Sequence, residues 1–400
     1  MKHLLEIHIL QNFAPSNLNR DDTGSPKDAL FGGVRRARIS SQCLKRAARE
    51  YVRNHPNGLP QEALALRTKR LVQALVEQLE AKGRAKEEAR QKVEQALGGM
   101  GLRVDEEGKT QYLLFLGRQE VDRIAELIDQ HWDGLVAPQT QEEGGKKKAK
   151  DAKRAAREAV PDEIKKALNH VLDGGKALDV ALFGRMLADL PEKNQDAACQ
   201  VAHAISTHAV EREFDFYTAV DDLKPDDNAG ADMIGTVEFN SACFYRYAAL
   251  DLEKLRENLQ GDTELMLKGL EAFLRAVVKA KPSGKQNSFA AHNDPEYAVF
   301  TVRQEADPRN LANAFEKPVR PSRDLSLTAA SAVRLEQKWR WLEDCYGEAG
   351  KTFRINAPEI DGAEFRRDDE DQARRVGEGV ASLEALIQNT LQAVREQLGV

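Results

Sequence analysis

The chain has 400 residues, of which 41% are hydrophobic and 31% charged, and its formal net charge is -6. This length exceeds that of a single small module and suffices for one large domain or two to three ordinary ones. No run of residues reaches the roughly 18 apolar positions of a membrane-spanning helix, so no span is expected. Because the net charge is negative, binding to a polyanion would have to depend on a local basic patch.

The four cysteines are widely scattered and show no CxxC pairing. Their density is far below that of a disulfide-stabilised scaffold. We therefore expect a cytoplasmic protein. Cys43 has cationic neighbours that could lower its pKa, but without a convincing histidine partner it is a poor candidate nucleophile.

The first predicted element is a buried strand at residues 3 to 11 (HLLEIHILQ), which is rich in β-forming residues and hydrophobic on both faces. Residues 12 to 33 follow, with two prolines, three glycines and several Asn and Asp, which favour turns. A loop of about twenty residues is uncommon inside a compact domain and is often functional.

A basic run occupies residues 34 to 49, with six Arg or Lys in sixteen positions and no acidic residue. Ser40 or Ser41 is predicted to cap a helix that begins at Gln42. Helical spacing turns Leu44, Ala48 and Tyr51 inward, and it gathers the polar residues on the opposite side as a stripe. That stripe comprises Gln42, Lys45, Arg46 and Arg49, and Arg35, Arg36 and Arg38 precede it.

The stripe is a candidate phosphate-binding surface, since a serine-capped helix start offers free N–H groups and Gly32-Gly33 permits close approach. A solvated helix face is the alternative. Adjacent Asp21 and Asp22 could hold Mg²⁺ in a nuclease, but neighbouring carboxylates seldom converge on one ion, and pairing with Arg20 or Lys27 is favoured.

Residues 61 to about 173 have a mostly helical pattern and suggest a helical insertion. Within it, residues 141 to 158 are rich in Gly and Lys and lack an apolar stripe, which predicts a mobile loop passing into a frayed helix. Residues 194 to 212 are predicted to be helical again. On such a helix Cys199 and His203 share one face, but the further ligands of a zinc site do not declare themselves.

A long β-hairpin is predicted for residues 214 to 250, whose two β-like arms flank the turn-rich sequence KPDDNAGA. The second arm alternates as a strand with one buried face would. The apolar residues towards the tip belong either to a core or to a surface that wedges between bases or docks on a neighbouring copy. They are Phe216, Tyr217, Met233 and Ile234.

A helix ending at Pro282 and a short strand at 297 to 302 complete the main pattern. Without the insertions, the order is strand, helix, strand, helix, strand, with one sheet strand unaccounted for. This order is consistent with an α+β fold of the ferredoxin-like βαββαβ type, the topology of an RNA-recognition motif. Two further helices, near 325 to 345 and 380 to 398, would pack outside it.

Motifs for catalysis are missing from the sequence: it contains no GxxxxGK[ST], GxGxxG, GxSxG or HExxH. We therefore expect no catalytic residues, no metal site and no cofactor.

One long segment, LNRDDTGSPKDALFGGVRRARISSQCLKRAARE (18 to 50), closely resembles the N-terminal signature of the CasC family, the backbone subunit of the type I-E CRISPR Cascade complex. The blocks VAHAISTHAVEREFDFYTAVDD, MIGTVEFNSACFYRYA, GKQNSFAAHNDPEYAV and NLANAFEKPVR follow in the family's order. Together they span most of the chain.

The resemblance implies a hand-like arrangement of domains. A modified RNA-recognition-motif palm would comprise residues 1–58 and 235–325, and helical fingers residues 59–193 with a mobile Lys-rich loop at 141–156. A helix and a protruding thumb hairpin would occupy 194–234, and a C-terminal helical region 326–400. The Lys-rich loop and the tail from about 350 have no clear counterpart in the family.

The resemblance also implies a function in antiviral defence. Copies of such a subunit form a homo-oligomer along guide RNA (crRNA), and each thumb inserts against the RNA held by its neighbour. Target DNA pairs with the displayed guide. A nuclease that is recruited to the complex or fused to it cuts the DNA, and other Cascade subunits are further partners. The subunit itself is not catalytic; the alternative is a ribonuclease that uses Asp21 or Asp22, as in related type III backbone subunits.

Individual residues take their expected roles from the same resemblance. Met186 would stack against a base, Phe216, Tyr217 and Ile234 would form the apolar part of the thumb, and Arg320 would be a further RNA contact. Position 49 is Arg in place of an expected Lys, which keeps the charge. The residues that match the family's phosphate and sugar contacts are Arg20, Lys27, Ser40, Gln42, Lys45 and Arg49, and Arg35, Arg38 and Arg46 of the basic run complete the predicted RNA-binding set.

Overall fold

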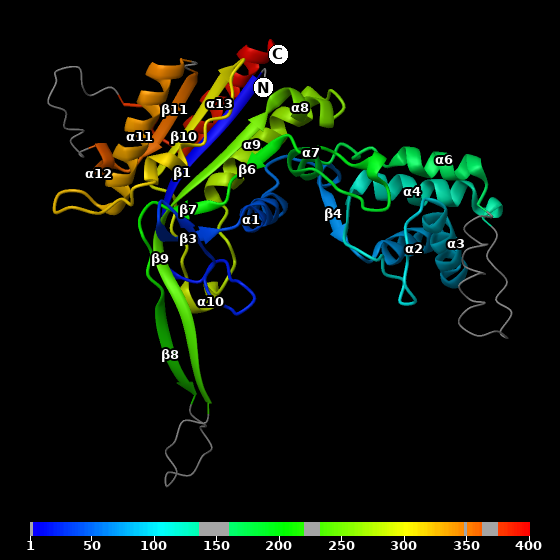
Figure 1. Ribbon diagram of the computed structural model, residues 1–400. Coiled ribbons are helices and arrows are strands. Elements are labelled where there is room, and N and C mark those ends of the chain that lie inside the picture. The colour runs from blue at the N-terminus through cyan, green and yellow to red at the C-terminus, as the bar shows by residue number, and fades with distance from the viewer. Residues whose placement is uncertain (1–2, 136–159, 220–232, 348–349, 362–374) are drawn as a thin grey trace, which may run out of the picture. The chain divides into compact units, whose positions relative to one another are not determined.

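A computed structural model describes residues 3–135, 160–219, 233–347, 350–361 and 375–400 (Figure 1). The chain divides into two compact units. The sheet unit comprises Met1–Asn57, Cys199–Glu253 and Leu267–Val400, and the helical unit comprises Gly58–Ala198 and Lys254–Met266. Within the described residues, no helix has the length and apolarity needed to cross a membrane.

The sheet unit is built on a ten-stranded sheet with the order β12-β11-β10-β1-β9-β7-β3-β2, in which β6 and β8 also pair with β9. The strand β1 is central and lies antiparallel to both β9 and β10. The strands are β1 (His3–Ser16), β2 (Asp28–Phe31), β3 (Val34–Ile39), β6 (Cys199–Val201), β7 (Ala204–Ser206), β8 (Glu213–Ala219), β9 (Met233–Asp251), β10 (Tyr297–Gln304), β11 (Lys351–Asn356) and β12 (Glu378–Gly379).

Helices cover both faces of this sheet (Figure 1). On one face α11 packs Leu335 and Trp339 into a core with Leu10 and Tyr245. On the other face Arg246 of β9 donates a hydrogen bond to the carbonyl of Val277 in α9. The helices of the chain are α1 (Ser41–Asn54), α2 (Leu71–Ala81), α3 (Lys86–Gly99), α4 (Arg118–Gln130), α6 (Asp162–Val171), α7 (Leu178–Phe183), α8 (Leu252–Asn258), α9 (Thr263–Lys279), α10 (Gln286–Phe289), α11 (Leu327–Tyr346), α12 (Pro358–Asp361) and α13 (Leu383–Leu398).

Because helices cover both faces of the sheet, its central strands are buried on both sides. Leu4 to Leu10 are buried on both sides of β1, as predicted for a strand that is hydrophobic on both faces, and the burial includes Glu6 and His8. In β9, burial on both faces extends from Ala242 to Leu250, so the prediction of one buried face is wrong for this half of the strand. Among its polar residues there, Arg246 donates a hydrogen bond through Nη1 to the side chain of Gln11 at 2.6 Å.

The predicted helix at 194 to 212 is wrong, because β6 and β7 lie there instead. Cys199 pairs with Leu250 and Ile205 with Tyr245, both antiparallel to β9. An open edge of β9 thus supplies backbone partners that outweigh the helical spacing of small apolar residues. These short strands are the sheet strand that the sequence pattern left unaccounted for, and the α+β class is confirmed.

The C-terminal segment is also not purely helical. The predicted helices are present as α11 and α13, but β11 extends the sheet beside β10, with Phe353 opposite Phe300, and β12 pairs in parallel with β11. Since β10 would otherwise leave an open edge, strand pairing decides the structure of these residues.

The long loop after β1 is shorter than predicted. β1 continues to Ser16 through a register shift after Phe13. Residues 28 to 39 form a β-hairpin, whose turn is Gly32-Gly33 with φ of 62° and 77°. Positive φ at both central residues is what a two-residue turn of type I′ requires. A Cβ on Gly32 would lie 1.9 Å from the carbonyl oxygen of Glu316, so the glycine serves packing in the protein and the irregular loop is confined to residues 17 to 27.

The helical unit has its own core, formed mainly by α2, α3, α4 and α6. Beside them, β4 (Ala65–Thr68) pairs antiparallel with β5 (Leu114–Gly117). The segment from 61 was predicted to start a helix, but it begins with a 3-10 turn (Gln61–Ala63) and β4. Further 3-10 turns are Trp132–Gly134, Pro191–Lys193 and, in the sheet unit, Leu311–Phe315. The Lys-rich segment 141–156 lies outside the described residues.

Candidate nucleic-acid interface

The helix α1 presents the predicted polar stripe. Its N-cap is Ser40, whose hydroxyl accepts a hydrogen bond from the backbone N–H of Cys43 at 3.3 Å. Leu44 and Ala48 are buried, as predicted, whereas Tyr51 is only half-buried. On the opposite side Gln42 and Arg46 are exposed, and Lys45 and Arg49 are half-buried. Arg46 is partly neutralised because it binds Glu50 one turn later, at 2.8 Å.

A polar hollow of about 510 Å³ adjoins α1. Arg20, Arg46 and Lys285 contribute positive charge to its lining, and Asp21, Asp22 and Glu50 contribute negative charge. Two of the segments that line the hollow meet in a tight contact, because a Cβ on Gly284 would lie 2.2 Å from the carbonyl oxygen of Leu18. The structure therefore brings Arg20 and Arg46 together.

Lys285 was not predicted as a site residue. Lys279 and Lys281 lie within six residues of it, so the sequence does contain a local group of bases, which Pro282 and Gly284 interrupt. A second signal was its place in GKQNSFAAHNDPEYAV, a block that carries the family resemblance, immediately after the glycine that permits the close approach to Leu18.

The three arginines of β3 have different surroundings. Arg36 is fully buried and donates to the carbonyls of Phe31, Ser206, Phe315 and Glu316 at 3.2, 3.3, 2.7 and 3.1 Å. Burial lowers the pKa of its guanidinium. Arg36 therefore joins segments of the sheet unit and does not belong to the surface, although it is part of the basic run.

Arg35 lies in a balanced cluster of charges. It forms an ion pair with Asp28, which also binds Arg212 at 2.6 Å, and Arg212 binds Glu238 at 3.0 Å. Burial acts to raise the pKa of Asp28, but the hydrogen bonds from Arg212 and Arg35 outweigh it and hold the pKa below its ordinary value. Two carboxylates thus offset two arginines, and Arg35 adds less to the positive field than the sequence suggested.

Arg38 and Lys27 form a second basic spot. The backbone N–H of Arg38 donates to the carbonyl of Lys27 at 2.9 Å, and both residues line a small surface hollow. Arg38 also contacts Nδ1 of His203 at 3.0 Å. Burial first, and then the charges of Arg38 and Lys27, lower the pKa of His203.

The acidic pair of the loop is used unequally. The Oδ1 atom of Asp21 accepts hydrogen bonds from the N–H and hydroxyl of Thr23 and from the N–H of Ser25, at 3.0, 2.7 and 3.0 Å. The hydroxyl of Thr23 is the largest cause that lowers the pKa of Asp21. Asp21 thus holds the turn, in place of the suggested pairing with Arg20 or Lys27, whereas Asp22 is exposed. Among the described residues, no three His, Cys, Asp or Glu side chains gather as metal ligands would.

The two candidate thiols are not activated. Cys199 lies on β6 and not on a helix, so the shared helix face with His203 does not exist. Burial raises the pKa of Cys199 to about 12 and also raises that of Cys43. A thiol that stays protonated is a weak nucleophile.

The hairpin of β8 and β9 exposes aromatic rings. Phe216 is 65% exposed and Tyr217 41% exposed. Tyr217 faces Gly235 across the hairpin, and its ring covers the glycine, because a Cβ there would lie 2.3 Å from Cζ. Phe214, also 65% exposed, was missed, although the two-residue period of a strand places it on the face of Phe216. The side chain of Ile234 lies outside the described residues, and its backbone pairs with Thr218.

Two residues that were predicted to contact RNA, Arg320 and Met186, are distant in the sequence from α1 and from the hairpin of β8 and β9. Arg320 is exposed in the sheet unit and follows Val319, whose N–H donates to the carbonyl of Thr207 at 2.9 Å. Met186 belongs to the helical unit and is 78% exposed. Both positions are accessible to a ligand.

A comparison with models of known protein families identifies the family of this chain. Residues 5–386 match the family model described as CT1975-like protein. The chain belongs to the CT1975-like protein family. No curated protein matches the chain.

Solved structures extend the comparison. A chain of a "CRISPR RNA-guided surveillance complex, pre-nicking" is 29% identical, with a TM-score of 0.77 over 98% of this chain and 99% of that chain. A chain of a "CRISPR RNA-guided surveillance complex" is 26% identical, with a TM-score of 0.70 over the same shares. These matches confirm the resemblance to subunits of CRISPR surveillance complexes.

Proposed function

We propose that this protein is the guide-RNA-binding backbone subunit of a type I-E CRISPR Cascade complex and that it is not catalytic. The observation that carries the proposal is the similarity, over 98% of the chain, to solved chains whose titles name CRISPR RNA-guided surveillance complexes. Copies of the subunit polymerise along guide RNA, and target DNA pairs with the displayed bases. Other Cascade subunits complete the complex, and a recruited or fused nuclease cuts.

The basic side chains of the sheet unit support this role. Those on α1, together with Arg20, Lys27 and Arg38, are suited to phosphate oxygens, which carry no sequence information. A subunit that must accept every guide needs contacts of this kind, because base pairing then supplies the specificity. The exposed rings of Phe214 and Phe216 provide apolar surface for the RNA held by a neighbouring copy.

Binding to RNAs of several lengths and two unrelated sequences tests the proposal. We expect the mass of the complex to grow stepwise with RNA length, as measured by mass photometry, and the two sequences to bind equally well at matched salt. A protein that remains a monomer on long RNA, or that binds only one of the sequences, contradicts the proposal.

The alternative function is a ribonuclease that cuts target RNA. It is favoured by one observation, since Asp21 and Asp22 line the same hollow as Arg20, Arg46 and Lys285. The hydrogen bonds that already occupy Asp21 leave Asp22 as the available carboxylate. The assembled complex is incubated with Mg²⁺ and complementary RNA: we expect the RNA to remain intact, and cleavage that is lost in Asp22→Asn would establish the ribonuclease instead.

A further inference from the structure

Met186 is exposed on a segment that the helical unit holds firmly. Its side chain is 78% exposed, whereas Arg185 before it is 5% exposed and Leu187 after it 1% exposed. A single exposed apolar residue is common and by itself needs no explanation. The anchoring of both neighbours is the unusual feature.

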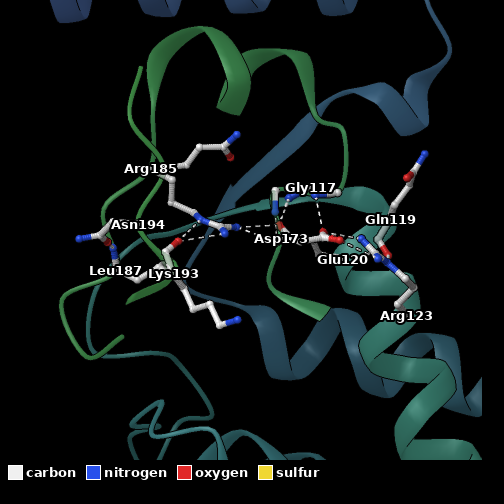
Figure 2. A network of polar contacts seen from close by, with 12 residues as sticks. Gly117, Gln119, Glu120, Arg123, Asp173, Arg185, Leu187, Lys193 and Asn194 are labelled. Atoms are coloured by element: carbon white, nitrogen blue, oxygen red, sulfur yellow. Dashed lines mark hydrogen bonds and ion pairs between the residues drawn. The ribbon is translucent and has the colours of Figure 1, made fainter. Parts of the chain in front are cut away.

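The backbone around Met186 is fixed from the facing segment (Figure 2). Arg185 and Gln195 exchange two backbone hydrogen bonds, each of 2.9 Å. The N–H of Leu187 donates to Oδ1 of Asn194 at 2.6 Å, and the side chain of Leu187 lies in the core of the unit. The backbone therefore cannot turn to bury Met186, and this side chain stays directed outward.

A buried ion pair adds a third anchor, between Arg185 and Glu120 of α4. One guanidinium nitrogen, Nη1, lies 2.8 Å from each carboxylate oxygen of Glu120, and the two side chains are 1% and 0% exposed. The Nε and Nη2 atoms of Arg185 donate to the carbonyl of Lys193, at 3.3 and 3.1 Å. Arg185 thus ties both segments of the Met186 turn to α4.

The carboxylate of Glu120 has further hydrogen-bond donors besides Arg185. Its oxygens also accept hydrogen bonds from the N–H groups of Gly117 and Gly174, at 2.7 and 2.8 Å. Gly175 is close as well, since a Cβ there would lie 2.9 Å from Cγ of Glu120. The carboxylate therefore has a single position, and Figure 2 shows Glu120 beside Gly117 and the guanidinium of Arg185.

Stability alone does not account for this pair. Two charges lose their hydration on burial, and a well-packed apolar pair of similar volume is often as stable or more stable. What the ion pair adds is defined geometry, because the guanidinium and the carboxylate are each held by several hydrogen bonds at once. The part of the chain whose geometry it defines is the turn that carries Met186.

We propose that Glu120, Arg185 and Asn194 are positioning residues that hold Met186 outward for contact with a base of the guide RNA. This inference rests on the proposed function. Glu120 and Arg185 are too deeply buried to touch RNA themselves, so they act through Met186. A thioether side chain on a fixed backbone suits the faces of all four bases, since it is polarisable and makes no demand on hydrogen-bonding pattern.

The test uses the complex assembled on guide RNA that carries the fluorescent adenine analogue 2-aminopurine at one position at a time. The difference in emission between wild type and Met186→Ala identifies the contacted position and defines the Met186 signal. In Glu120→Leu/Arg185→Met, which replaces the ion pair by apolar volume, we expect most of this signal to be lost. The Kd for unlabelled guide should rise less than about fivefold, because phosphate contacts supply most of the affinity.

Two further variants separate positioning from general stability. Asn194→Ala leaves the ion pair intact but removes the acceptor for Leu187, and we expect it to lose part of the signal. Arg123→Gln is the matched control: Arg123 lies on α4 one turn after Glu120, and its hydrogen bonds go to Asp173, at 2.7 Å, and to the carbonyl of Gln119, not to the Met186 turn. It should lower the melting temperature without changing the signal.

A folded double variant with the full signal overturns the inference, and if that variant does not fold, a full signal in Asn194→Ala overturns it. No difference between wild type and Met186→Ala at any labelled position also overturns it, while RNA binding, measured separately, leaves the proposed function standing. A wild-type protein that binds no RNA refutes the proposed function itself.

Discussion

The strand β3 and the helix α1 follow each other in the chain and carry three and four bases, yet they present this charge differently. In β3 the two-residue period places Arg36 and Arg38 on one face and Arg35 on the other, and Arg36 is buried among carbonyls whereas Arg38 is half-buried and Arg35 is exposed. In α1 the helical spacing gathers Lys45, Arg46 and Arg49 on one side. A single basic run in the sequence therefore produces one coherent basic surface on α1 and divided charge on β3.

The largest expected effect is on stability, in the buried residue of β3. Arg36→Met keeps the aliphatic volume but leaves four carbonyls without their donor. We expect the free energy of unfolding to fall by about 3 kcal/mol, since unsatisfied buried acceptors are costly. The control, Arg35→Ala, removes a half-exposed ion pair and should cost less than about 1 kcal/mol. Urea denaturation measures both, and equal losses would show that Arg36 is not a structural residue.

The contrast with His8 shows what a buried base needs in order to stay charged. Arg36 has four acceptors, whereas Nδ1 of His8 contacts only the hydroxyl of Tyr245, at 2.9 Å, and Arg303 lies nearby. Burial, and then Arg303, lower the pKa of His8 from 6.5 to about 3. Folded His8 is therefore neutral at pH 5, while the same side chain in the unfolded protein binds a proton.

We expect this difference to weaken the fold in acid. As the pH falls below the unfolded pKa, only the unfolded state takes up the proton of His8, and stability declines by about 1.4 kcal/mol per pH unit. At pH 5 the loss from this residue is about 2 kcal/mol. In His8→Asn, the difference in unfolding free energy between pH 7 and pH 5 should shrink by this amount, and an unchanged difference would show that folded His8 is protonated.

The third effect, on RNA affinity, compares the two elements directly. Lys45→Ala/Arg49→Ala on α1 should weaken binding about tenfold for every guide and reduce the slope of log K against log salt by about one to two units. Arg35→Ala/Arg38→Ala on β3 should have a smaller effect, because Asp28 already offsets Arg35. Filter binding across a salt series measures both. A larger loss from the β3 pair, or a loss that depends on guide sequence, would contradict the comparison.

Local sequence patterns predicted the elements whose structure is determined within a short stretch of the chain. β1, α1, α9 and the β8–β9 hairpin were found because their periodicity and caps lie within a short window. The strands β6 and β7 have three residues each and exist only because β9 is beside them, so no local pattern marks them. For the same reason, the local spacing of small apolar residues wrongly predicted a helix at residues 194 to 212, where β6 and β7 lie.

The candidate site divides in the same way. The stripe on α1 follows from helical spacing alone. The role of Arg36 depends on carbonyls of Ser206, Phe315 and Glu316, and the place of Lys285 depends on the contact between Gly284 and Leu18. These partners are distant in the sequence and become neighbours only through the fold, and therefore the sequence run overstated β3 and omitted Lys285.

The smallest expected effect on stability concerns the exposed part of the hairpin of β8 and β9. Phe216 of β8 is 65% exposed, whereas Phe244 of β9, within the sheet, is 3% exposed. Phe216→Ser should change the unfolding free energy by no more than about 0.5 kcal/mol, because an exposed ring has little burial to lose. Phe244→Ser should cost several kcal/mol, since it removes a large core side chain and buries a hydroxyl.

The functional prediction for the hairpin has the opposite order. If the ring of Phe216 contacts RNA held by a neighbouring copy, Phe216→Ser should yield a folded monomer with a normal circular dichroism spectrum that fails to form long assemblies on RNA. Phe214→Ser should act in the same direction, because both rings lie on one face of β8. If the variant Phe214→Ser/Phe216→Ser assembled normally on RNA, these exposed rings would have no part in polymerisation. The basic side chains of α1 would then have to account for assembly on RNA without them.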